Sequence, residues 1–114
     1  MSIKKTRVMW IERKDGLAGP VRIGRVTFSK SGQSVHYGGI TFGRLHGQGF
    51  KANYFDMDTR EQYWISGCRN DGRDALYNTD VEIDDDVREE YWVQIRNQPE
   101  NVEVRVFRAM GKCR

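Results

Sequence analysis

Short segments rich in β-branched and aromatic residues recur along this chain at intervals of about ten residues, separated by glycine-containing turns. The clearest of them are residues 6–12, 21–28, 51–56 and 61–66. Many short strands with such spacing are typical of small barrels and sandwiches. The sequence therefore predicts a mainly β fold, a small SH3-like or other partly open barrel of short antiparallel strands, with a single curved sheet as the alternative.

One α-helix is predicted over residues 85–97, packed on the barrel. Acidic residues at 84–86 offer a helix N-cap and place negative charge at the positive end of the helix dipole. Pro99 ends the helix. At 100° per residue, Val93 falls outside the apolar stripe, which consists of Val87, Tyr91, Trp92 and Ile95.

Two further patterns concern individual strands. Within residues 21–28, the apolar positions are first odd-numbered and then even-numbered, and the change falls at Gly24. A glycine at such a change predicts a β-bulge. Alternation of valine with charged residues over 102–106 predicts a last strand in that range.

The chain has 114 residues, which fits a single domain over 1–114 with its core in about 6–107. The basic tail at 108–114 is left open as ordered or flexible. Hydrophobic residues make up 38% of the chain, which excludes a disordered chain, and no apolar run reaches the roughly 18 residues of a membrane span. The N-terminus lacks a signal-peptide pattern, so we expect a cytoplasmic protein. Cys68 and Cys113 are then expected as free thiols, with a disulfide left open.

The net charge of +3 conceals a strong asymmetry along the chain. Residues 1–51 carry ten Lys and Arg against two acidic residues, whereas residues 52–104 carry five against fourteen. Residues 105–114 carry four basic residues and no acidic one. Either neighbouring strands neutralise one another, or a basic face docks an anionic partner. We favour neutralisation between neighbouring strands, since opposite charges commonly pair across a sheet.

Candidate catalytic residues are few. Cys68 could act as a nucleophile only with an imidazole within hydrogen-bond reach, and the two histidines are His36 and His46. Nothing in their spacing indicates such a contact. Paired metal-ligand spacings such as Cys-x-x-Cys are missing from the sequence, so we expect no metal and no cofactor.

The candidate binding residues combine arginine or lysine with aromatic rings. In protein interfaces, tyrosine, tryptophan and arginine supply most hot spots. On a small barrel, the same residue types grip single-stranded nucleic acid by phosphate pairing and base stacking. The candidates are Arg22, Arg25, Tyr37, Arg44, Lys51 and Tyr54, and a nucleic-acid site would add Lys30.

Several segments together resemble a family of short bacterial proteins for which no activity is established. They include RIGRVTF at 22–28, KANYFD at 51–56, YWISG at 63–67 and IDDDVREEYW at 83–92. The resemblance covers about residues 21–97 and implies a bacterial, intracellular, single-domain protein, without implying any functional residue.

The preferred function is therefore a small cytoplasmic, non-catalytic module that binds another protein. Two alternatives stay open. One is a single-stranded nucleic-acid-binding barrel that uses the basic N-terminal half. The other is a small hydrolase or toxin that uses Cys68 with a histidine.

Overall fold

The structure of the protein, a computed structural model, describes residues 5–14, 21–45, 52–72, 74–75 and 78–110. Eight strands within these residues form one sheet, in the order β1-β6-β5-β4-β3-β2-β7-β8. The strands are β1 (Thr6–Arg13), β2 (Val21–Phe28), β3 (Ser34–Tyr37), β4 (Ile40–Arg44), β5 (Tyr54–Asp56), β6 (Gln62–Gly67), β7 (Thr79–Ile83) and β8 (Val106–Ala109).

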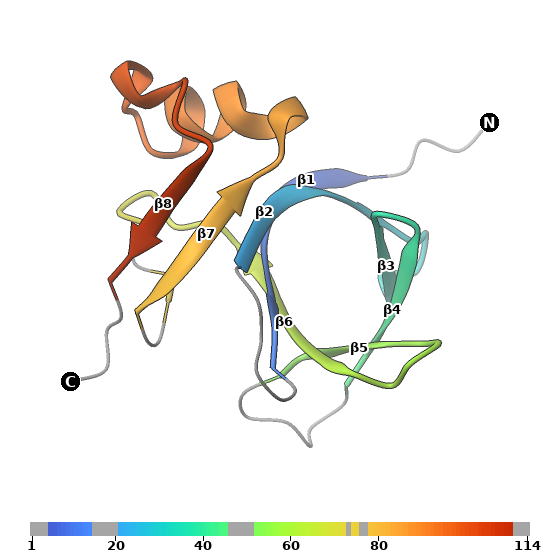
Figure 1. Cartoon of the computed structure of the whole chain (residues 1–114). Coiled ribbons are helices and arrows are strands. Elements are labelled where there is room, and N and C mark those ends of the chain that lie inside the picture. The colour runs from blue at the N-terminus through green and yellow to red at the C-terminus, as the bar shows by residue number, and fades with distance from the viewer. Residues whose placement is uncertain (1–4, 15–20, 46–51, 73, 76–77, 111–114) are drawn as a thin grey trace.

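The first six strands form a closed antiparallel barrel. Strand β1 pairs with both β2 and β6, which joins the two ends of the β2–β6 meander, and Figure 1 shows the resulting ring. The predicted small barrel of short antiparallel strands is thus confirmed, in a closed rather than a partly open form.

Two strands extend the sheet beyond the barrel at the edge of β2. Strand β7 runs parallel to the first half of β2, from the pair Val21–Val81 to the pair Ile23–Ile83. Strand β3 pairs with the last two residues of β2 on the same edge. Strands β3 and β7 therefore diverge from a common neighbour, and β7 and β8 lie beside the barrel with the helical segments above them (Figure 1).

Strand β1 explains how one short domain holds two cores. Four consecutive apolar side chains, at positions 8–11, are all buried. Because side chains alternate along a strand, Met9 and Ile11 enter the barrel, while Val8 and Trp10 face the layer outside it. The barrel core adds Val26, Val35, Phe42, Tyr54 and Ile65. The outer core adds Val21, Ile23, Ala75, Val81, Ile83, Val87, Tyr91, Trp92 and Ala109.

The predicted β-bulge at Gly24 is wrong. Strand β2 pairs with β1 in an unbroken register, in which Met9 faces Gly24 and each following pair shifts by one residue on each strand. The apolar positions change parity because the strand changes cores: Ile23 packs in the outer core, and Val26 packs in the barrel core. A strand with a different core on each face needs no inserted residue.

The predicted helix is present but is not a regular α-helix. It begins as a 3₁₀ turn, η1 (Asp85–Val87), and continues as a π-helical segment, η2 (Glu90–Ile95). Its predicted stripe is confirmed, since Val87, Tyr91 and Trp92 are buried and Val93 is exposed. The wider π turn carries a hydrogen bond of 2.9 Å from the Arg96 N–H to the Tyr91 carbonyl. No helix among the described residues is long and apolar enough to cross a membrane.

Three other expectations from the sequence differ from the structure in detail. Asp84 occupies the helix N-cap position, but its side chain makes no capping hydrogen bond, because it bonds across the sheet instead. The last strand begins at Val106 rather than Val102, since a short 3₁₀ turn, η3 (Pro99–Asn101), precedes it. Strands β5 and β6 form the predicted hairpin, although β5 is shorter than predicted, and residue 51 lies outside the described residues.

Candidate functional site

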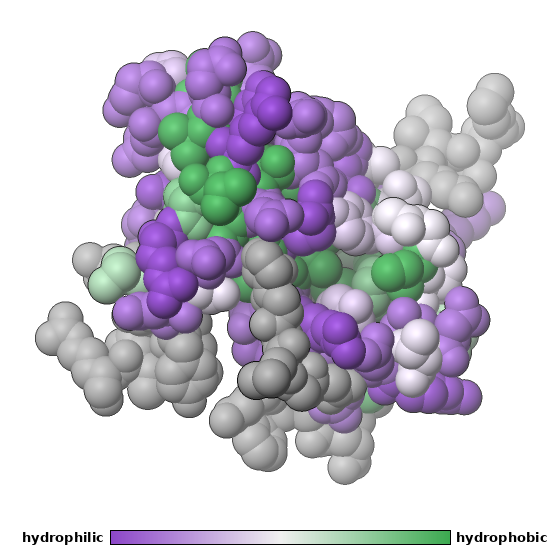
Figure 2. Space-filling view, viewed as in Figure 1, coloured by the Kyte–Doolittle hydropathy of each residue, from purple (hydrophilic) through white to green (hydrophobic). Residues whose placement is uncertain are grey.

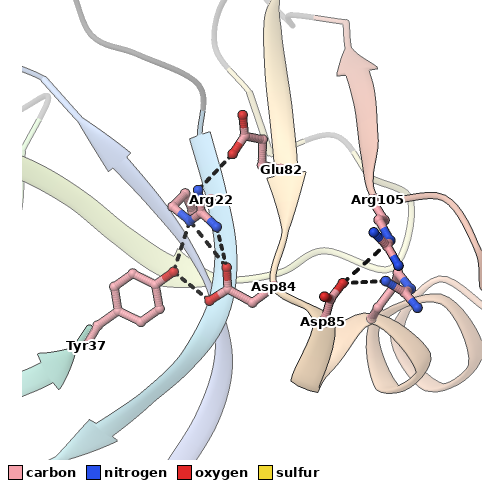
Figure 3. A network of polar contacts seen from close by, with 7 residues as sticks. Arg22, Tyr37, Glu82, Asp84, Asp85 and Arg105 are labelled. Carbon is pink, nitrogen blue, oxygen red and sulfur yellow. Dashed lines mark hydrogen bonds and ion pairs between the residues drawn. The ribbon is translucent and has the colours of Figure 1, made fainter. Parts of the chain in front are cut away.

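Arg22 is held by acidic residues that lie about sixty positions away in the sequence. Its register partner on β7 is Glu82, and the two side chains form an ion pair of 2.7 Å. A second ion pair of 2.8 Å joins Arg22 to Asp84 (Figure 3). These bonds hold the pKa of Arg22 above its ordinary value, chiefly through Asp84. The positive charge of Arg22 is therefore balanced within the fold.

Tyr37 joins the same network from β3. Its hydroxyl donates a hydrogen bond of 2.6 Å to Asp84 and accepts one of 3.2 Å from Arg22. Burial, followed by the bond to Asp84, raises the pKa of the phenol to about 12. The network spans β3, β2 and the end of β7, so it bridges the strands that diverge from β2. Figure 3 shows the three side chains pointing toward one another.

The remaining candidate binding residues do not gather into one surface. Arg25 forms an ion pair of 2.7 Å with Glu90 of the π-helical segment, and Tyr54 is buried in the barrel core. Arg44 is exposed at the end of β4, and Lys30 is exposed in the turn after β2. Lys51 lies outside the described residues.

The ion pairs agree with the interpretation favoured above, in which neighbouring strands of opposite charge neutralise one another. Arg22–Glu82 and Arg25–Glu90 join the basic N-terminal part of the chain to its acidic middle. Arg108–Asp80, at 3.0 Å, joins the basic C-terminal end to the same middle, and these two residues are also register partners. Opposite charges that are distant in sequence are therefore neighbours in the fold.

Cys68 and His36 lie far apart in the strand order. His36 belongs to β3 and its Nδ1 shares a hydrogen bond of 3.1 Å with the Thr41 hydroxyl. Cys68 follows β6, and two strands separate β6 from β3 in either direction around the barrel. Burial raises the pKa of the Cys68 thiol to about 12. His46 lies outside the described residues, and the described part of the chain holds no group of three potential metal ligands.

The free edge of the sheet belongs to β8, which pairs only with β7 among the described residues. The Ile83 N–H donates a hydrogen bond of 2.8 Å to the carbonyl of Arg105. Because hydrogen-bonded and non-hydrogen-bonded pairs alternate in an antiparallel ladder, Phe107 and Ala109 direct their main-chain groups toward β7. The main-chain groups of Val106 and Arg108 therefore face away from the sheet.

Side chains beside this edge are both apolar and basic. Val106 is 56% exposed and Met110 is 66% exposed, the two most exposed large apolar side chains among the described residues. Figure 2 shows apolar surface near the start of β8. The side chains of Arg105 and Arg108 are 67% and 58% exposed, and their acidic partners are Asp85 and Asp80. The edge thus presents main-chain donors and acceptors, apolar side chains and exposed guanidinium groups together.

Sequence reasoning missed this edge as a site. The signal in the sequence is that residues 105–114 carry four basic residues and no acidic one, directly after an alternating valine segment. That signal indicates a basic strand, but it does not show that the strand ends the sheet. The order of the strands is needed to recognise the edge.

Comparisons of the chain with protein-family models, curated proteins and solved structures gave no match. The resemblance to a bacterial family therefore stays a prediction.

Proposed function

We propose that this domain is a protein-binding module that adds an extended segment of its partner to the free edge of β8. One observation supports this proposal above all. The main-chain groups of Val106 and Arg108 face away from β7, the only strand that pairs with β8 among the described residues. Strand addition uses such main-chain groups for affinity and uses the alternate side chains for specificity.

The chemistry of the edge favours an acidic partner segment. The ion pairs of Arg105 with Asp85 and of Arg108 with Asp80 are exposed, at 3.7 Å and 3.0 Å. Exposed ion pairs contribute roughly 0–1 kcal/mol, so a carboxylate of the partner can replace Asp80 or Asp85 at little cost. Val106 and Met110 then supply apolar contacts beside the paired strand.

The candidate residues of β2 give less support to a nucleic-acid site. Arg22 is held by three partners at once, Glu82, the half-buried Asp84 and the Tyr37 hydroxyl, and the carboxylate of Glu90 beside Arg25 would repel phosphate. Binding of nucleic acid depends on cations that are free to release counterions from phosphates. We therefore keep the preferred function from the sequence, but we move its surface from the candidate residues of the N-terminal half to the edge strand β8.

A displayed library of random twelve-residue peptides tests the proposal. Selection on the protein should enrich segments that are acidic and rich in β-branched residues. The Val106→Pro variant removes the outward-facing N–H while leaving the hydrogen bonds to β7, because edge positions of this kind tolerate proline. Val106→Thr is the matched control, since it keeps both the N–H and the branched shape.

Peptides selected on the original chain should bind Val106→Pro about tenfold more weakly and Val106→Thr within about twofold. Amide hydrogens of Val106 and Arg108 should also exchange more slowly once peptide is bound. Equal affinity for the proline and threonine variants would contradict strand addition. If β8 instead pairs with β8 of a second copy of the chain, sedimentation should show a concentration-dependent dimer that Val106→Pro abolishes. That result would contradict an acidic segment as the partner.

A further inference from the structure

One end of the barrel carries basic side chains, and its strands contribute no acidic side chain there. It is the end at which β1, β3 and β5 begin and β2, β4 and β6 end, because neighbouring strands of the barrel are antiparallel. We call it the basic mouth and define it by Lys5, Arg7, Phe28 and Arg44. The turn from β2 to β3 adds the exposed Lys30 at the same end. The partner site proposed at β8 shares no residue with the basic mouth.

Strand alternation directs the three basic side chains of the mouth to the inner face of the barrel. Met9 of β1 lies in the barrel core, and Lys5 and Arg7 stand on the same face of the chain. Phe42 of β4 lies in that core too, and Arg44 shares its face. The core residues are buried, whereas the three basic residues are exposed. The basic side chains therefore line the rim, where the barrel opens to solvent.

The contact between Arg7 and Gly67 supports this direction. Gly67 of β6 is the register partner of Met9, so a side chain at Gly67 would point to the barrel core as Met9 does. A Cβ at Gly67 would lie 3.0 Å from Nη2 of Arg7. The guanidinium therefore rests on the main chain of β6, on the inner face of the barrel.

The positive charge of the basic mouth is not balanced within the described part of the chain. No ion pair joins its three basic residues to any described residue. The acidic residues that follow β6 most closely are Asp71 and Asp74, and Arg69 bonds to both, through an ion pair of 3.1 Å and a main-chain hydrogen bond of 3.0 Å. In contrast to Arg22, the cations of the mouth can release counterions from phosphates.

An aromatic ring lies among these cations. The Phe28 N–H donates a hydrogen bond of 2.8 Å to the Lys5 carbonyl, so the two residues stand opposite each other on β2 and β1. Phe28 is half-buried and packs against the barrel core. Its ring therefore lies beside Lys5 on the inner face of the barrel. Basic groups beside an aromatic ring are the means by which proteins hold single-stranded nucleic acid, through phosphate pairing and base stacking.

The cations are spread around the mouth. Arg7 and Arg44 belong to β1 and β4, which are separated by two strands in either direction around the ring (Figure 1). Charges on opposite sides of an opening suit a ligand with several phosphates better than a single phosphate. An acidic peptide would also offer several charges, but it has no bases to stack on Phe28.

We propose that the basic mouth binds single-stranded nucleic acid. Lys5, Arg7 and Arg44 pair with phosphates of the strand, and the ring of Phe28 stacks on one base. A double helix fits this arrangement less well, because its bases are already stacked on one another. The site is separate from strand addition at β8, and either function can fail without the other.

The probe is a fluorescein-labelled oligothymidine of twelve nucleotides, titrated by fluorescence anisotropy from about 50 mM salt upward. The logarithm of its affinity should fall with the logarithm of the salt concentration, with a slope of about −2 for three phosphate contacts. Arg44→Gln should weaken binding about three- to tenfold and should flatten the slope by about 0.7. Arg108→Gln removes an exposed arginine of β8 instead, and is the matched control that should change affinity by less than about twofold.

Phe28→Leu tests the stacking contact, since leucine keeps an apolar side chain against the barrel core. It should weaken binding about tenfold without changing the salt slope. Unlabelled oligothymidine should displace the probe, whereas a duplex of the same length and a polyglutamate of the same charge should compete at least about tenfold less well. Equal competition by the duplex would overturn the proposal, and equal competition by polyglutamate would replace nucleic acid with an acidic protein segment.

A measurement without variants guards against poor folding of Phe28→Leu. Phenylglyoxal modifies accessible arginines, and peptide mapping by mass spectrometry reports each site. Oligothymidine should slow the modification of Arg7 and Arg44 but not that of Arg108. Undetectable binding at the lowest salt concentration, or equal protection of all three arginines, would contradict a site at the basic mouth.

Discussion

The ring of Tyr37 lies over the main chain of Gly24, in the space that any other residue would fill with its side chain. A Cβ at Gly24 would overlap Cε1 of Tyr37 and would lie 2.5 Å from Oδ2 of Asp84. The glycine therefore lets a tyrosine of β3 reach a carboxylate at the end of β7 across the middle of β2. This contact connects the barrel to the two strands outside it.

Gly24→Ala should destabilise the protein by about 1–3 kcal/mol, because the added methyl group forces Tyr37 and Asp84 apart. Chemical denaturation of the variant measures this loss. The double variant with Tyr37→Ala tests the cause, since removal of the ring should relieve part of the strain. Strictly additive losses in free energy would show that the ring is not what excludes the methyl group.

Tyr37→Phe should remove about 1 kcal/mol of stability at neutral pH, because Asp84 loses the hydrogen bond of 2.6 Å from the phenol. The pKa of Tyr37 is raised from 10.0 to about 12 in the folded protein. Its contribution to stability is therefore fully present below pH 10 and is lost as the pH rises toward 12. Unfolding at pH 8 and pH 11 measures this loss, and the phenylalanine variant should show a smaller decrease between the two. An equal decrease in the phenylalanine variant would show that Tyr37 does not cause this pH dependence.

The strands were predictable because their signal is local. Residues 21–28 alternate branched and charged side chains, and the structure has a strand with these limits. The buried face of the helical segment was also predictable, since Val87, Tyr91 and Trp92 follow helical spacing. Its π geometry was not, because α and π turns differ little in the spacing of apolar residues and the choice depends on packing against the outer core.

The partners of the candidate binding residues could not be predicted. Arg22 and Glu82 are sixty positions apart and become neighbours only through the parallel pairing of β2 with β7. The role of Gly24 could not be predicted from the sequence either. Its parity change has two physical explanations, a bulge or a strand between two cores. The unbroken pairing of β2 with β1 and the packing of Ile23 and Val26 distinguish them.

Arg96 should stabilise the outer core through its contacts with three rings. Its guanidinium carbon lies 5.8, 5.2 and 5.8 Å from the ring centres of Tyr91, Trp92 and Phe107, and Nη1 donates a hydrogen bond of 2.9 Å to the Tyr91 hydroxyl. Arg96→Met keeps the bulk but removes the charge and the donor, and should cost about 2 kcal/mol of unfolding free energy.

Arg60→Met is the matched control for this prediction. Arg60 is exposed and its guanidinium carbon lies 5.6 Å from the centre of a single ring, that of Phe55. Its replacement should cost about 0.5 kcal/mol in the same denaturation experiment. Equal losses for the two variants would show that the three rings around Arg96 add nothing to its effect.

Cys68 should react very slowly with alkylating reagents in the folded protein. Burial is the largest cause that raises its pKa from 9.0 to about 12, and the charge of Asp74 adds to it, whereas Arg7 and Arg96 act in the opposite direction. The thiolate is the reactive form, so at pH 8 the folded protein should be labelled on the order of a thousandfold more slowly than the unfolded chain. Because the folded pKa is raised, the contribution of this thiol to stability is present below pH 9 and is lost toward pH 12.

Iodoacetamide labelling at pH 8, with and without denaturant, measures the reactivity of Cys68, and peptide mapping separates it from Cys113. Arg7→Gln should slow the labelling of Cys68 further, because it removes a positive charge that favours the thiolate. Arg44→Gln should not change it. Labelling of the folded protein as fast as that of the unfolded chain would show a reactive thiolate, and would return Cys68 to the position of a candidate nucleophile.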